Sequence, residues 1–380
     1  MNTHPSRRSR GRLAVALILA ATAVACGGGD EIVDQISGAV EDLTSTTEGS
    51  TTEGEVLTPG SSSPEASPSE TTQADEPVPP AARMPLTGEP LDSADDIPDR
   101  PALAVKIPNN PQALPQAGLN EADIVYEEII NDRITRFAAV FHSQGSDPLG
   151  PIRSGRAQDV DLLSNLNQPL FAWSGGNAGV TRVVNASSLV SLSYVGGYGN
   201  SYYRRDGRGG APHNLFSDTE TLWALAPDDY SVPTTVFPYL LPGVDVEGDP
   251  ATTVEVTMDS ILASWTYDVS SGRYLRSQYG EAHMTELSGQ VWADNLVILF
   301  ADYRAGVIDA KSPEAQTVGS GTVMVFSDGV VRTGVWSRDS NTDAFSFHTD
   351  ATGVVELGLK PGRTFVEIPR NDPANVVYAS

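Results

Sequence analysis

The stretch that decides the fold of this chain runs from residue 122 to residue 142 and reads ADIVYEEIINDRITRFAAVFH. Residues 124–127 and 134–142 are rich in the β-branched and aromatic side chains that favour strands. Asn131-Asp132-Arg133 lies between them and has the composition of a turn. The stretch therefore predicts two neighbouring strands joined by a short connection.

The sequence around this pair alternates between strand and helix patterns. Residues 102–107 and 171–173 are predicted as strands. Residues 157–166 place Val160, Leu163 and Leu166 on one helical face. Asn177 is a predicted cap of a second helix, which carries Val180, Val183 and Val184. The alternation predicts an α/β domain with a mixed sheet over residues 85–242.

Beyond Pro242-Gly243 the sequence changes to strand signals alone. The predicted strands are residues 253–258, 263–269, 273–278, 296–300, 323–326 and 330–336. Ser327-Asp328-Gly329 predicts a hairpin turn between the last two, and Lys360–Arg363 predicts another between residues 354–359 and 364–368. The fold class is therefore α+β, with a smaller, mostly antiparallel β domain over residues 243–380.

The N-terminus has the pattern of a targeting segment. Four arginines within residues 7–12 precede an apolar run, residues 13–25, which is too short to span a membrane. Ala23-Val24-Ala25-Cys26 resembles the bacterial lipobox, with Ala23 where that motif usually has Leu. We expect residues 1–26 to be a lipoprotein signal peptide and Cys26 to carry a lipid that holds the protein on the extracytoplasmic face of the membrane. Ordinary cleavage after an A-x-A site remains the alternative.

Residues 27–84 are predicted to be a disordered tether. Between Gly27 and Asp99 there are 17 acidic residues and one basic residue, among many Ser, Thr and Pro. The whole chain has a formal net charge of −25, which argues against nucleic acid as a partner. Cys26 is the one cysteine, so a disulfide framework and a cysteine-based metal site are excluded.

Several short sequence motifs with polar residues resemble those of one known family. They are Ala122–Glu127, Ile134–Phe137, Gly150–Arg156, Gly175-Gly176 and Ala211–Leu215, and after residue 253 Tyr267-Asp268, Tyr274-x-Arg276 and His283. In this order they resemble the DUF3048 family of bacterial lipoproteins over about residues 85–369. The resemblance implies a two-domain envelope lipoprotein without an established activity.

One phrase departs from the pattern of the family. Ile107-Pro108-Asn109-Asn110-Pro111 stands where relatives typically read I-D-N-H-P, so Pro108 and Asn110 replace Asp and His. A mechanism that requires either of these groups is therefore in doubt for this chain.

Three arginines are the first candidates for ligand binding. Arg136 lies on a predicted strand, while Arg153 and Arg156 lie in a Gly- and Pro-containing turn before a predicted helix. Their planar guanidinium groups suit phosphate or carboxylate, and free N–H groups at the helix start would add to such a site. Internal ion pairs with Asp123, Glu127 and Glu128 are an equally good explanation.

The loop over residues 202–214 supplies the other ligand-binding candidates, Arg204, Arg205, His213 and Asn214. Its glycines and arginines are typical of an anion-binding loop, although it lacks the ending of a P-loop. A solvated surface loop is the alternative, and His213 is predicted to hold the loop more readily than to act as an acid or base.

Catalytic signatures are weak. The folded part lacks a Gly-x-Ser-x-Gly elbow, the five histidines lack metal-ligand spacing, and Cys26 is committed to the membrane. The catalytic candidates are therefore only Asp123, Glu127 and His213. Asp123 and Glu127 would lie roughly 13 Å apart along one strand, too far for a glycosidase pair.

Two functions remain. The preferred one is a non-catalytic binding protein, without a cofactor, for an anionic envelope ligand such as a wall polymer or glycan. The alternative is a metal-assisted hydrolase or transferase acting on a phosphate-linked envelope intermediate. In both, we expect Arg136, Arg153, Arg156 and His213 to line one pocket, with the loop 202–214 as its wall and Asp123 or Glu127 at its floor.

Overall fold

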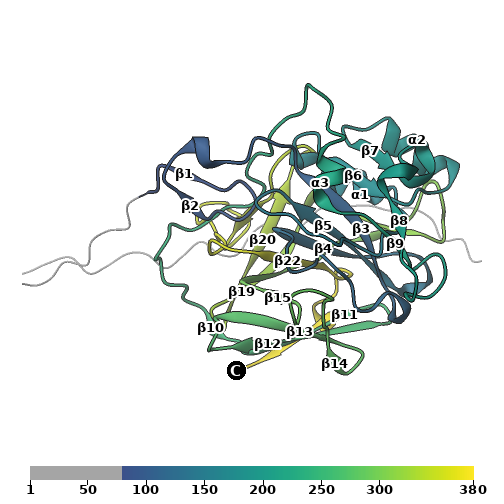
Figure 1. Cartoon of the computed structure of the whole chain (residues 1–380). Coiled ribbons are helices and arrows are strands. Elements are labelled where there is room, and N and C mark those ends of the chain that lie inside the picture. Colours follow the sequence, from purple (N-terminus) through teal and green to yellow (C-terminus); the bar gives the residue numbers. More distant parts are fainter. Residues whose placement is uncertain (1–78) are drawn as a thin grey trace, which may run out of the picture. The chain divides into compact units, whose positions relative to one another are not determined.

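The computed structural model describes residues 79–380 (Figure 1). Cys26, the predicted signal peptide and most of the predicted tether lie outside these residues. The described part is an α+β structure in which strands dominate, as predicted. No helix in this part combines the length and the apolar composition needed to cross a membrane.

A large mixed sheet forms the centre of the fold. Its strands are β3 (Leu103–Asn109), β4 (Ile124–Ile129), β5 (Thr135–Phe141), β6 (Leu170–Trp173), β7 (Val190–Ser193), β10 (Asp249–Pro250), β16 (Asn295–Leu299), β19 (Gly319–Ser327), β20 (Val330–Arg338), β21 (Ser346–His348) and β22 (Thr364–Ile368). They follow the order β10-β20-β19-β16-β22-β4-β5-β3-β6-β7, and β21 pairs with β20. The predicted pair β4 and β5 is confirmed as an antiparallel hairpin.

Strand β22 joins the two halves of this sheet. It runs parallel to β16 on one side, with Phe365 opposite Leu296, and parallel to β4 on the other, with Phe365 opposite Val125. Strands from before and after residues 242–249 therefore belong to one sheet. The division into domains at this segment stays a prediction, and the segment itself has no helix or strand before β10.

A second, antiparallel sheet covers one face of the large sheet. It consists of β11 (Thr253–Met258), β12 (Ile261–Asp268), β13 (Arg273–Gln278), β14 (Glu281–Ala282), β15 (Trp292–Ala293) and β23 (Val376–Ala379). Buried and exposed residues alternate along β11, β12 and β13, so one face is buried and the other faces solvent. The strands predicted at residues 253–258, 263–269 and 273–278 are confirmed as β11, β12 and β13, which pair antiparallel, and no α-helix follows Thr253 in the described chain. The hairpin predicted at Ser327-Asp328-Gly329 is also confirmed, between β19 and β20 of the large sheet.

The opposite face of the large sheet carries α1 (Gln158–Leu163) and α2 (Ala178–Asn185). The third helix, α3 (Thr219–Trp223), instead packs Leu222 and Trp223 into the core on the first face. The predicted cap is confirmed, because Asn177 Oδ1 accepts a hydrogen bond of 2.9 Å from the N–H of Val180. Leu163 and Leu166 are buried among Phe171 and other apolar residues of this face, whereas Val160 is only partly buried.

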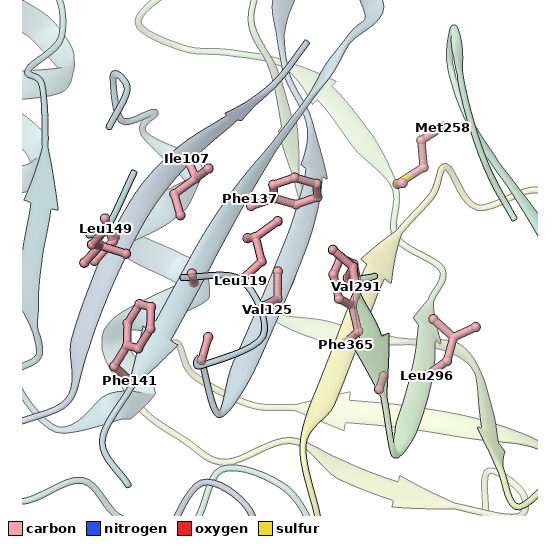
Figure 2. Close-up of a cluster of buried hydrophobic side chains, with 14 of the residues drawn as sticks. Ile107, Leu119, Val125, Phe137, Phe141, Leu149, Met258, Val291, Leu296 and Phe365 are labelled. Carbon is pink, nitrogen blue, oxygen red and sulfur yellow. The ribbon is translucent and has the colours of Figure 1, made fainter. Parts of the chain in front are cut away.

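Buried aliphatic side chains, with aromatic rings such as Phe137 and Phe365 among them, fill the space between the two sheets (Figure 2). Phe365 of β22 lies 4.9 Å from the ring of Trp265 on β12 and 5.9 Å from the ring of Phe137 on β5, both in edge-to-face arrangements. Such pairs add to the gain from burying apolar area. These ring contacts thus pack the second sheet against strands from both halves of the large sheet.

A buried charged cluster lies within this core. Nη2 of Arg276 on β13 is 2.7 Å from Glu127 Oε2 on β4, and its Nε is 3.6 Å from Glu367 Oε1 on β22. Trp265 Nε1 donates to the same Glu367 oxygen at 2.7 Å. All three charged side chains have no solvent exposure. Burial, and next the charge of Glu127, raise the pKa of Glu367.

One predicted hairpin is wrong. Residues 364–368 form a strand, but residues 354–359 do not, and β22 pairs instead with two strands far away in sequence. The remaining strands form separate pairs: β1 (Ala82–Arg83) with β2 (Pro90–Leu91), β8 (Tyr203–Arg204) with β9 (Leu215–Phe216), and β17 (Tyr303–Ala305) with β18 (Pro313–Ala315). β1 lies within the last residues of the predicted tether.

Replacing Arg276 with Met should destabilise the protein by about 3–5 kcal/mol, because Glu127 and Glu367 would remain buried without their common cation. Arg273→Met is the matched control, since Arg273 lies on the same strand with a side chain that is 40% exposed. We expect that control to cost less than about 1 kcal/mol. Urea unfolding of the purified variants measures both values, and equal losses would contradict the importance of the cluster.

Candidate functional site

The segment from Arg153 to Arg156 lies across the ends of β3 and β6. The N–H of Arg153 donates to Lys106 O at 2.8 Å, and the carbonyl of Arg153 accepts from the N–H of Ser174 at 2.9 Å. Gly155 is required here, because a Cβ atom at this position would lie 2.7 Å from the ring of Trp173. The close approach holds the arginines on either side of Gly155 above the sheet.

Arg136 reaches this segment from β5. Its side chain lies on the face of the sheet opposite the charged cluster, and it pairs in register with Glu128 of β4 and Pro108 of β3. Nη1 of Arg136 donates to Ser154 O at 2.6 Å, while its Nε is buried without an acceptor among the described residues. The guanidinium group is therefore only partly satisfied by the protein.

Four predicted site residues lie close enough to influence one another electrostatically. Burial, followed by the charges of Arg156 and Arg153, lowers the pKa of Arg136 to about 9. Burial and Arg156 lower the pKa of Arg153. Burial and then Arg153 and Arg136 lower the pKa of His213. The structure thus brings together Arg136, Arg153, Arg156 and His213, which we call the arginine cluster.

The members of the cluster differ in how they are bonded. Arg156 donates from Nη1 to Gly155 O at 2.9 Å and from Nη2 to Asn131 Oδ1 at 2.5 Å. The half-buried guanidinium of Arg153 has neither a hydrogen bond nor an ion pair with any residue in the described chain. Arg153 is consequently the member that is most available to a ligand.

A buried ion triad lies beneath the arginine cluster. Lys106 Nζ is 2.6 Å from Glu128 Oε1 and 2.8 Å from Asp159 Oδ1, and all three side chains are at most 1% exposed. Burial, and next the neighbouring Asp159, raise the pKa of Glu128. Asp159 Oδ2 also accepts from the N–H of Arg156 at 2.6 Å. The N–H that was predicted to bind an anion at the helix start is therefore already bonded within the chain.

The predicted catalytic carboxylates lie elsewhere. Asp123 accepts hydrogen bonds from the N–H groups of His142 and Ser143, at 2.7 and 2.8 Å, and burial raises its pKa to about 6. Glu127 belongs to the charged cluster with Arg276, on the other face of the sheet. Glu128 and Asp159 occupy the place that the sequence analysis gave to Asp123 or Glu127.

The loop arginines are bonded within the protein. Arg204 Nη1 donates to Asn214 Oδ1 at 2.7 Å. Arg205 forms an ion pair of 2.7 Å with Glu286, and its guanidinium lies 4.8 Å from the ring centre of Phe216. Of the loop candidates, His213 is thus the one that the structure brings to the arginine cluster.

Sequence reasoning missed the triad of Lys106, Glu128 and Asp159. A signal was present, because Lys106 interrupts an apolar strand pattern and a buried lysine requires a counter-charge. A cavity of about 190 Å³ borders Arg156, and Asp309 and Glu314 also line it. These acids make that side of Arg156 unsuitable for an anion, so the face that Arg153 and Arg136 share is the better candidate.

The described residues offer no group of three His, Cys, Asp or Glu side chains arranged to hold a metal ion. Asp123 and Glu127, the predicted ligands of the metal-assisted alternative, bond to different partners on different parts of the fold.

Two family descriptions match this chain. The first is "Protein of unknown function (DUF3048) N-terminal domain", over residues 86–231, and the second is the corresponding C-terminal domain, over residues 253–366. A curated relative from Bacillus subtilis (strain 168), named "Putative lipoprotein YerB", is 28% identical over 268 residues, which cover 67% of this chain and 78% of the relative.

The fold also matches a solved structure. The crystal structure of the YerB protein from Bacillus subtilis superimposes with a TM-score of 0.67 and 24% identity, covering 79% of this chain and all of that chain. This likeness concerns the fold alone.

Pro108→Asp should weaken anion binding at the arginine cluster at least tenfold. Pro108 pairs in register with Arg136, so an aspartate there would place a carboxylate beside that guanidinium and compete with the ligand. Pro108→Asn is the matched control, since it has the same size without the charge and should retain binding. Titration calorimetry with pyrophosphate measures both affinities, and equal affinities would remove Arg136 from the site.

Proposed function

Because the chain belongs to the DUF3048 family, whose N-terminal and C-terminal domains it carries, we propose that it is a lipid-anchored envelope protein that binds an anionic ligand through Arg136, Arg153 and Arg156. The family description assigns no activity, so the ligand class comes from the chemistry of the side chains. Guanidinium groups recognise phosphate and carboxylate through paired N–H donors in a fixed plane.

The observation that carries the proposal is that Arg136 and Arg153 have no carboxylate partner. Burial and mutual repulsion lower the pKa of Arg136 and of Arg153, and neither forms an ion pair among the described residues. A bound anion would relieve both effects, because it would supply the missing acceptors and the opposite charge. Arg338 and Arg363 also lack an ion pair, but their guanidinium groups donate to backbone carbonyls, whereas that of Arg153 has no such acceptor in the described chain.

The nearby carboxylates do not fill this role. Glu128 and Asp159 share the ammonium group of Lys106, at 2.6 and 2.8 Å, and lie beneath the cluster. Their negative charges stabilise the protonated guanidinium of Arg136, because they oppose the lowering of its pKa. The outward side of Arg153 remains open to a ligand, and this is where we place the anion.

The anchoring part of the proposal rests on the sequence and on one relative. The Bacillus subtilis protein is named as a lipoprotein, and this chain has Cys26 as its one cysteine after a basic and then apolar N-terminus. We propose that Cys26 carries the lipid and that the ligand is a component of the cell envelope, such as an anionic wall polymer or glycan.

The metal-assisted hydrolase has no observation in its favour. Its proposed ligands, Asp123 and Glu127, are bonded to His142 and Arg276 in separate regions. A non-catalytic binding function requires only the arginines that the structure brings together.

Arg153→Ala should reduce the affinity for pyrophosphate ten- to a hundredfold, which corresponds to about 1.5–3 kcal/mol for a charged hydrogen-bonded contact. The melting temperature should stay within a few degrees of the parent, because Arg153 is bonded to the described chain only through its backbone. The matched control is Arg182→Ala, which removes one exposed arginine from α2 and should leave binding unchanged.

Calorimetry gives the affinities and thermal unfolding gives the melting temperatures. If Arg153→Ala unfolds the protein, Arg153 is a structural residue. If it leaves binding intact in a folded protein, the anion binds elsewhere. Either result removes the centre of the proposed site.

Cys26→Ser should move the protein out of the membrane fraction, or leave it unprocessed, because serine lacks the thiol that takes the lipid. Fractionation of cells that express the parent and the variant, followed by immunoblotting, measures the change. A correctly processed variant that stays in the membrane fraction would disprove anchoring at Cys26.

A further inference from the structure

A second group of cations lies next to the arginine cluster. A cavity of about 290 Å³ is lined by Arg133, Arg304, Lys311 and Arg370, together with Asp259 and Tyr303. We call this cavity the basic hollow. In a chain with a formal net charge of −25, four cations around one cavity are a local reversal of charge.

Three of these four cations form no direct ion pair in the described chain. Asp259 binds Arg370 through two contacts, from Nε at 2.6 Å and from Nη2 at 3.0 Å. Arg133, Arg304 and Lys311 are exposed, and none of their charged groups forms an ion pair within residues 79–380. The one carboxylate of the hollow is thus already occupied, while three cations remain open.

One short turn connects the basic hollow to the arginine cluster. The 3-10 turn Asn131–Arg133 joins β4 to β5. At its start, Asn131 Oδ1 accepts the hydrogen bond from Arg156 Nη2 at 2.5 Å, and at its end Arg133 lines the hollow. Arg133 of the hollow and the hydrogen-bond partner of Arg156 are therefore the two ends of a single turn, so the two sites are neighbours, although the turn itself also contains Asp132.

We infer that the basic hollow is a second subsite for the same ligand, and that this ligand is an extended polyanion with repeating phosphate groups. The inference rests on the proposed function of the arginine cluster. A single small anion would occupy one site and leave the other cations unpaired. A polymer that reaches both sites gains affinity, because its second contact is intramolecular.

The test compares a short and a long anion on the purified full chain. Calorimetry with pyrophosphate and with long-chain inorganic polyphosphate gives the affinities per phosphate for the parent, Arg304→Ala, Lys311→Ala, Arg153→Ala and the control Arg182→Ala. Poly(glycerol phosphate) in a third series distinguishes a wall-type polymer from free polyphosphate.

We expect both polymers to bind at least tenfold more tightly than pyrophosphate. Arg304→Ala and Lys311→Ala should weaken polymer binding severalfold, reduce its dependence on salt, and change pyrophosphate binding less than twofold. Arg153→Ala should weaken both. Because Arg304 and Lys311 have exposed side chains, these variants should fold like the parent.

Two results would overturn the inference in distinguishable ways. If pyrophosphate binding depends on Arg153 but polymer binding is indifferent to Arg304 and Lys311, the basic hollow is not a subsite and the proposed function stands. If none of the anions binds, or if Arg153→Ala has no effect on any of them, the proposed function fails together with the inference.

Discussion

One guanidinium group, that of Arg276, balances two carboxylates that come from the two ends of the folded chain. Glu127 belongs to the strand that precedes the β4–β5 hairpin turn, Glu367 belongs to the last strand of the large sheet, and Arg276 reaches them from the second sheet. The desolvation of these charges is costly, so each depends on the others for its place in the core. The ion pairs therefore favour the packing register in which Arg276 meets both carboxylates.

Side chains alternate between the two faces of the sheet along β4, and this determines which cation each of its two glutamates meets. Glu127 and Glu128 are neighbours in sequence, but a strand sends them to opposite faces. Glu127 binds Arg276 between the sheets, and Glu128 binds Lys106 beneath the helices. Because both carboxylates are used in this way, the arginines above β5 have no acidic partner on β4. Pro108 has the same effect on β3, since the residue opposite Arg136 on that strand carries no charge.

Local patterns in the sequence predicted most of the strands of four residues or more, and two of the hairpins. The pairs β4 with β5 and β19 with β20 have strand-forming residues on both sides of a short turn, so nearby residues suffice. The pairing of β22 could not be predicted from local patterns. Lys360–Arg363 has good turn chemistry, yet residues 364–368 pair in parallel with partners such as Ile124, and no local signal encodes a contact over that separation.

The candidate site was predictable to a similar degree. Residue type alone singled out Arg136, Arg153 and Arg156, because arginines in Gly-containing turns of an acidic chain are unusual. Their counter-charges were not predictable, since the choice between Glu127 and Glu128 depends on which face of β4 meets which layer. Arg205 shows the same limit: its partner Glu286 lies in a distant segment that only the fold brings near.

The position of β22 also dictates the order in which the chain can fold. A ribosome releases the chain from its N-terminus, so β4 emerges long before its parallel neighbour, which ends at Ile368 of 380 residues. Until β22 has been synthesised, one edge of β4 has unpaired N–H and C=O groups. Glu127 likewise lacks the packed core in which it pairs with Arg276. The N-terminal strands therefore cannot complete their sheet before β22 has been synthesised. Completion of the sheet depends on parallel pairing between segments far apart in sequence, which is a slow kind of contact to form.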